Sequence, residues 1–140
     1  MRPALCTKFA GKAEAALVAA VEIYNKPSFP YREETLALLA INAWELLLKA
    51  KLLKDASNDF RVIRVYETRR TKSGRTSRKL YLKRNRAGNP LTISILSCVS
   101  VFDKNRMTRL SPQIKSNLEA LVAIRDGAAH YINASPVLAK

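Results

Sequence analysis

The sequence predicts a mainly α-helical domain: a bundle of about four to five helices that carries an inserted basic β-hairpin. Apolar residues recur at helical spacing in several segments, and prolines and turn sequences separate these segments. Residues 60–86 differ, because they are rich in the β-branched, aromatic and basic residues of a solvated hairpin. The chain has 140 residues, which fits one domain over residues 1–140.

Two helices are expected in the first part of the chain. Residues 11–25, GKAEAALVAAVEIYN, place four large apolar residues at helical spacing: Leu17, Val18, Val21 and Tyr24. The next segment, KPSFPY, holds two prolines and should end this helix. A second helix should begin near Tyr31 and run to about Asp55, with Glu33 and Glu34 in the first turn, where the helix dipole favours acids.

The sequence shows no sign of a membrane or secreted protein. The most apolar run, residues 36–48, is shorter than the roughly 20 residues that span a bilayer, and it contains Asn42 and Glu45. The N-terminal residues lack the apolar stretch of a signal peptide. Cys6 and Cys98 are too few for a disulfide framework, and one histidine is too few for most histidine metal sites. A cytoplasmic protein without a metal or cofactor is therefore expected.

A basic β-hairpin is expected next. Residues 60–67, FRVIRVYE, and residues 79–84, KLYLKR, resemble strands, and residues 71–77, TKSGRTS, resemble the turn between them. Residues 84–90 should form a loop that ends with Asn89 and Pro90 as the start of a third helix, residues 91–102. The β-branched content of residues 91–102 leaves a strand as an alternative.

A fourth helix should follow Ser111 and Pro112, which repeat the capping pattern. Its residues in helical register are Ile114, Leu118, Leu121, Val122 and Arg125. Gly127 is expected to end or kink this helix, which would place His130 just beyond it.

The charge of the chain indicates an anionic partner. Lys and Arg total 25 against 11 for Asp and Glu, a formal net charge of +14. Such a balance suits nucleic acid, an acidic membrane surface or an acidic protein. Residues 61–86 hold eleven basic residues and one acidic residue, Glu67, so most of the net charge lies in the hairpin.

Contact between this hairpin and nucleic acid is the favoured interpretation. Arginine makes bidentate hydrogen bonds to phosphate, and Tyr66 and Tyr81 could stack on unpaired bases. The alternatives are a solvated hairpin whose charges prevent aggregation, and a docking site for an acidic protein. The candidate nucleic-acid-binding residues are Arg69, Arg70, Lys72, Arg75, Arg78, Lys79, Lys83, Arg84 and Arg86.

A second candidate site surrounds the only histidine, His130. Histidine moves protons near neutral pH, and Arg125 could stabilise a phosphorane beside it. Together they would suffice to cleave RNA through its own 2′-hydroxyl, a reaction that needs no metal. Asn42 and Glu45 lie inside an apolar run and need polar partners. Arg125 is one possible partner of Glu45, and Lys49, one turn along the same helix, is the other.

Residues 125–130, RDGAAH, resemble the R-x4-H motif of the HEPN superfamily, whose members are small helical domains and in many cases ribonucleases of toxin–antitoxin, abortive-infection and CRISPR defence systems. Residues 23–54, 84–92 and 117–132 also resemble a bacterial HEPN-like domain of unknown function. The resemblance implies a HEPN-like bundle, a homodimer with facing motifs, and catalysis by Arg125 and His130. It also implies that Glu45 or Asn42 orients Arg125, and that Asp126 is the usual polar residue after the arginine.

We therefore expect a metal-independent endoribonuclease of a bacterial defence or toxin system. The alternative is a non-catalytic nucleic-acid-binding module of a larger defence protein. A third possibility is a structural or toxin–antitoxin partner protein whose hairpin docks an acidic protein. The sequence ends soon after the motif, which leaves open that the chain is a fragment of a longer protein.

Overall fold

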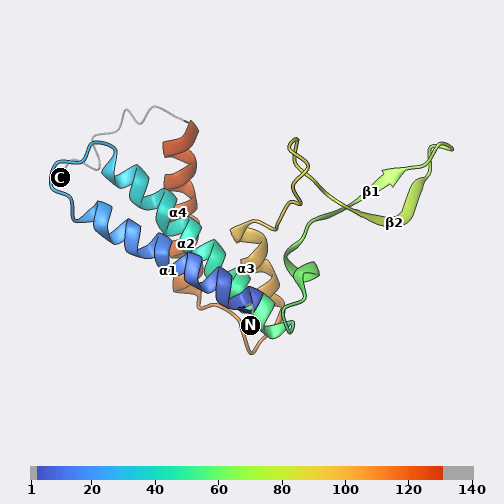
Figure 1. Ribbon diagram of the computed structural model, residues 1–140, viewed down its shortest axis with the longest axis horizontal. Coiled ribbons are helices and arrows are strands. Elements are labelled where there is room, and N and C mark those ends of the chain that lie inside the picture. The colour runs from blue at the N-terminus through green and yellow to red at the C-terminus, as the bar shows by residue number, and fades with distance from the viewer. Residues whose placement is uncertain (1–2, 131–140) are drawn as a thin grey trace.

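The computed structural model describes residues 3–130 and confirms a mainly helical fold with one small hairpin (Figure 1). Its four α-helices are α1 (Leu5–Tyr24), α2 (Arg32–Asp55), α3 (Ile95–Lys104) and α4 (Pro112–His130). A short 3-10 helix, η1 (Phe60–Ile63), precedes the antiparallel strands β1 (Tyr66–Arg70) and β2 (Thr76–Leu82). Figure 1 shows the hairpin projecting from the helices beyond α3.

The core of the bundle forms around α2. Its residues Ile41, Leu48 and Leu53 are buried, and α1, α3, α4 and η1 all pack against this helix. The other members of the core come from the remaining elements: Ile63, Ile95, Cys98, Val99, Phe102, Leu118 and Val122. None of the helices within residues 3–130 is both long enough and apolar enough to cross a membrane.

Helix α1 packs on α2 through small side chains. Ala13 and Ala20 are its only buried residues, and Ala37 and Ala43 are buried on α2. The four large apolar residues that predicted this helix are instead 51–58% exposed, and Leu17 lines a pocket with Trp44 and Leu47 of α2. The helix also begins at Leu5, earlier than the predicted residue 11, because nothing in residues 5–10 interrupts it.

The predicted first strand was wrong at its beginning. Residues 60–63 form η1, because the Asp59 carboxylate accepts a hydrogen bond from the Arg61 amide at 3.0 Å and so caps a helical turn. Ile63 is fully buried at the end of this turn. The first strand therefore begins only at Tyr66.

The predicted start of the third helix was also wrong. The Ser94 hydroxyl, 3.3 Å from the Ser97 amide, caps α3, so the helix begins at Ile95. Residues 91–93 are extended instead, and the Ile93 amide donates to the Ile63 carbonyl at 2.9 Å. The strand considered as an alternative does not form either, since Thr92 makes only an isolated β-bridge with Arg64.

The start of α4 was predicted correctly and its end was not. The Ser111 hydroxyl accepts a hydrogen bond from the Ile114 amide at 3.3 Å, and Pro112 is the first helical residue. The helix continues through Gly127 to His130. Arg125 and His130 therefore belong to one uninterrupted helix, about one and a half turns apart.

Candidate functional site

The basic arm, which we define as residues 65–83, is a twisted two-stranded ribbon. Tyr66 pairs with Leu82, Glu67 with Tyr81 and Thr68 with Leu80, and a bulge then shifts the register so that Arg70 pairs with Thr76. Gly74 closes the turn with φ +76°, a conformation that glycine adopts without steric cost. Its amide donates to the Thr71 carbonyl at 2.9 Å.

A ring of three backbone hydrogen bonds closes the base of the arm. The Lys83 amide donates to the Val65 carbonyl at 2.9 Å, the Val65 amide donates to Leu91 at 3.1 Å, and the Leu91 amide donates to Lys83 at 2.9 Å. Three extended segments thus meet at one point. Their mutual pairing fixes where the arm leaves the bundle.

A buried lysine ties this base to the central helix. The Nζ atom of Lys49 lies 2.9 Å from the Thr92 hydroxyl, one residue beyond the ring, and 2.5 Å from a carboxylate oxygen of Glu45. Lys49 is 3% exposed and is the one buried charged residue among residues 3–128. The pairing of Glu45 with Lys49, one of the two that the sequence allowed, is therefore the one that forms, and Arg125 is not its partner here.

The arm presents its cations to solvent. Glu67, 3.6 Å from Arg69, is the only acid of the described chain that pairs with a cation of residues 65–83. Six predicted nucleic-acid-binding residues lie exposed on the strands and the turn: Arg69, Arg70, Lys72, Arg75, Arg78 and Lys79. The remaining three are elsewhere. Lys83 lies at the base, while Arg84 and Arg86 belong to a second loop, where Arg84 donates to the Gly88 carbonyl at 2.8 Å.

The two arm tyrosines differ in what covers them. The Arg69 guanidinium lies 4.5 Å from the centre of the Tyr81 ring, and the Lys79 ammonium lies 5.5 Å from it. Both are cation–π contacts within the chain itself. Tyr66, near the base, is 37% exposed.

The second candidate site lies at the C-terminal end of α4. Arg125 keeps 29% of its side chain exposed and binds Asp126, with Nε 3.0 Å and Nη2 2.9 Å from the same carboxylate oxygen. The predicted polar residue after the arginine is thus its partner in the structure. His130 is the last residue of α4, and its side chain lies outside the part of the chain that is described.

Tyr31 holds this end of α4 against the beginning of α2. Its hydroxyl donates to the Ala128 carbonyl at 2.9 Å. Tyr31 has φ +63°, which is uncommon for a bulky residue and stores strain at this junction. Arg125 lies one turn before Ala128, so the hydrogen bond positions the turn that carries the predicted catalytic arginine.

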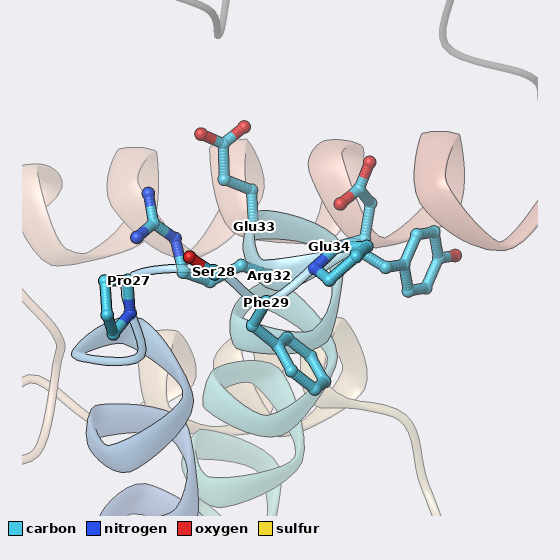
Figure 2. Close-up of a pocket in the computed structure, with 8 residues that line it drawn as sticks. Pro27, Ser28, Phe29, Arg32, Glu33 and Glu34 are labelled. Atoms are coloured by element: carbon cyan, nitrogen blue, oxygen red, sulfur yellow. The ribbon is translucent and has the colours of Figure 1, made fainter.

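A pocket of about 500 Å³ lies beside this junction, in the loop between α1 and α2 (Figure 2). It is lined by residues 27–34. Figure 2 shows the Arg32 guanidinium and the carboxylates of Glu33 and Glu34 extending on one side of the loop, with Phe29 on the other. The prolines of KPSFPY correctly indicated the break between α1 and α2, whereas nothing in the sequence pointed to the contact between Tyr31 and Ala128.

The polar residues of α2 and the arginine near the end of α4 do not form one site in this chain. Asn42 is exposed on α2, and Glu45 lies about 20 Å of helix beyond Arg32, where α2 begins beside the end of α4. Glu45 or Asn42 was expected to orient Arg125, and neither hydrogen-bonds to it among the described residues: Glu45 pairs with Lys49, and Arg125 pairs with Asp126. Among residues 3–130, no three His, Cys, Asp or Glu side chains are grouped closely enough to hold a metal ion.

Residues 8–140 match a family described as a domain of unknown function, DUF3644. This chain belongs to the DUF3644 family. The match covers the helical bundle, the basic arm and the predicted catalytic segment of the DUF3644 protein. No curated protein and no solved structure matches the chain.

Proposed function

We propose that this DUF3644 protein is a metal-independent endoribonuclease, in which the basic arm binds RNA and the Arg125–His130 turn cleaves it. The single observation that carries the proposal is the exposed, acid-poor arm, which hydrogen bonds at its base join to the bundle. A projecting ribbon with many cations and one acid creates a local positive potential that attracts anionic partners. Polyphosphate with its counterions is the anion best suited to a row of arginines.

The catalytic part of the proposal rests on the resemblance of residues 125–130 to the HEPN motif. In it, His130 serves as general base or acid at the 2′-hydroxyl or at the leaving oxygen. Arg125 stabilises the charge that develops on the phosphoryl group, which in such sites is usually the largest contribution. The contact between Arg125 and Asp126 supports this, because a carboxylate that holds one edge of the guanidinium leaves its other nitrogens available.

Dimerisation belongs to the same proposal. Two copies with facing α4 ends would bring two Arg125–His130 pairs together, which would complete a site that one copy holds only in part. The protein would act on RNA in the cytoplasm, as part of a defence or toxin system, with an antitoxin or a defence protein as its regulator.

The test is cleavage of a labelled structured RNA in EDTA by wild type, His130→Ala and Arg125→Lys. Wild type should leave cyclic phosphate ends, and both variants should lose cleavage while keeping their affinity for RNA. Arg125→Lys retains the charge and removes the planar fork, so its loss would assign the role to the guanidinium rather than to charge alone. Cleavage at the wild-type rate by His130→Ala would refute the mechanism.

The second candidate is a non-catalytic nucleic-acid-binding module. It is favoured by the contrast between six exposed arm cations and an arginine already paired within its own helix. In that case all three proteins bind RNA equally, binding weakens steeply with salt, and none cleaves.

A further inference from the structure

Most aromatic rings in and beside the arm already contact a cation of the same chain. Arg69 and Lys79 lie over Tyr81, and the Arg64 guanidinium lies 4.6 Å from the Phe60 ring centre. Proteins that bind single strands offer open aromatic rings on which successive bases stack. Only Tyr66, at the base of the arm, keeps an accessible ring. One ring is a poor platform for a run of unpaired bases.

The cations of the arm are distributed over both faces of the ribbon. Arg69 and Lys79 contact Tyr81 and so share its face. Adjacent residues of a strand point to opposite faces, which puts Arg70 and Arg78 on the other face, with Leu80. Lys72 and Arg75 extend this charge to the turn. A flat anionic surface or a single strand would meet only one of these faces.

We propose that the arm binds in the groove of a double-helical nucleic acid, with phosphates of the two strands against its two faces. This inference rests on the proposed function, in which the arm is the part that binds RNA. A groove has a phosphate wall on each side, which matches a ribbon that carries cations on each face. The major groove of B-form DNA, about 12 Å wide, admits a two-stranded ribbon. The major groove of duplex RNA is deep and narrow, so on RNA the arm would meet the two phosphate lines across the wide, shallow minor groove, where duplex RNA is recognised through shape and backbone.

The length of the arm agrees with this placement. At about 3.3 Å per residue, the stretch from Val65 to Thr71 reaches roughly 20 Å beyond the hydrogen-bonded ring at the base. That is enough to cross a groove and place the turn at its far side. Duplex RNA and duplex DNA share the required pattern of two phosphate lines, so the experiment separates them.

The test compares two variants that each remove two charges from one face. Arg69→Gln with Lys79→Gln alters the Tyr81 face, and Arg70→Gln with Arg78→Gln alters the other. Lys8→Gln with Lys12→Gln is the matched control, since both lysines are exposed on α1. Each set is made in the His130→Ala background, so that RNA is not cleaved during measurement, and far-UV circular dichroism confirms that the helices are retained.

Affinity is measured by fluorescence anisotropy over a range of salt concentrations, with a short duplex RNA, the same duplex in DNA, and an unstructured single-stranded RNA. Both arm variants should lower the slope of log affinity against log salt by about 2 for a duplex, and the control should leave it unchanged. Binding of both duplexes would show that the arm recognises the shared phosphate pattern. Binding of duplex RNA alone would add a requirement for the A-form groove.

Two outcomes would overturn the inference. In one, a single face carries the whole effect and the other behaves like the control, as a one-sided partner requires. In the other, single-stranded RNA binds as tightly as the duplexes and with the same dependence on the arm. Because binding is scored without cleavage, symmetric loss of duplex binding in a protein that never cuts RNA would support this inference while refuting the ribonuclease proposal.

Discussion

The Nζ atom of Lys49 lies 2.5 Å from Glu45 and 2.9 Å from Thr92, so one buried cation joins the central helix to the base of the basic arm. The two partners of the ion pair differ in burial. The side chain of Lys49 is 4% exposed, whereas that of Glu45 is 27% exposed. Their removal should therefore have unequal consequences.

Glu45→Ala should destabilise the protein more than Lys49→Met does. The first leaves a buried ammonium without its counter-charge, and we expect a loss of roughly 3 kcal/mol in the free energy of unfolding. Lys49→Met fills the space with an apolar side chain and leaves the Glu45 carboxylate within reach of water. A loss of about 1 kcal/mol in the free energy of unfolding is therefore expected. Urea denaturation of both variants and of the double variant measures this. Equal losses, or a double variant no better than Glu45→Ala, would contradict it.

Cys98 should make the stability fall in alkaline solution. Burial raises the pKa of its thiol to about 11, and the nearby Glu45 carboxylate also raises it while Lys49 lowers it. The unfolded chain loses this proton near the ordinary pKa of 9.0, whereas the folded chain keeps it. The contribution of the Cys98 thiol to the free energy of unfolding is therefore fully present below pH 9. It falls by about 2 to 3 kcal/mol as the pH rises toward 11.

Cys98→Ala isolates this contribution, because lysines and tyrosines titrate in the same range in both proteins. The difference between wild type and variant in free energy of unfolding should shrink between pH 9 and 11. Cys6→Ala is the control and should retain the wild-type slope. A constant difference between wild type and Cys98→Ala would refute the assignment.

Tyr31→Phe should loosen the end of α4 without unfolding the bundle. It removes the hydrogen bond to the Ala128 carbonyl, which is worth about 1 kcal/mol. Amide hydrogen exchange should accelerate in the last turn of α4 and remain unchanged near Leu118. Tyr24→Phe is the matched control, since Tyr24 is exposed on α1 and its ring, not its hydroxyl, contacts Arg32. Equal exchange in both variants would show that the Tyr31 hydroxyl is dispensable.

Ser111→Ala should lower the free energy of unfolding by about 1 kcal/mol, because the Ser111 hydroxyl accepts a hydrogen bond from one of the first amides of α4. Ser116→Ala, at an exposed position inside the same helix, should have little effect or a small stabilising one. Thermal unfolding of the two variants distinguishes a specific cap from a general effect of losing a hydroxyl. If Ser116→Ala is the more harmful change, the capping assignment is wrong.

Short sequence patterns predicted which helices and strands form, but not which face of each element packs against its neighbours. Ser111 with Pro112 identified the start of α4, and the alternation of basic and apolar residues identified the hairpin. Leu17 and Val21 correctly predicted a helix, yet the side that packs on α2 is the alanine side, because small residues let two helices approach closely. Hydrophobic spacing reports periodicity, and it cannot tell which of two apolar faces a neighbouring helix will choose.

Long-range pairing explains the remaining differences. Residues 91–93 looked helical in isolation, but the chain pairs them with residues 63–65, which lie far away in sequence. Glu45 had two plausible cations, Arg125 and Lys49, and the sequence left the choice between them open; the structure pairs Glu45 with Lys49. Tyr31 could not be linked to Ala128 from sequence, since the contact depends on how α2 and α4 cross.

The ring of hydrogen bonds formed by Val65, Lys83 and Leu91 also separates the arm from the bundle in their tolerance of substitution and insertion. Everything beyond it is connected to the bundle through a single closed junction, so residues can be added to or removed from the turn without disturbing the helices. A change in the length or charge of the turn should therefore leave the bundle and the end of α4 as they are.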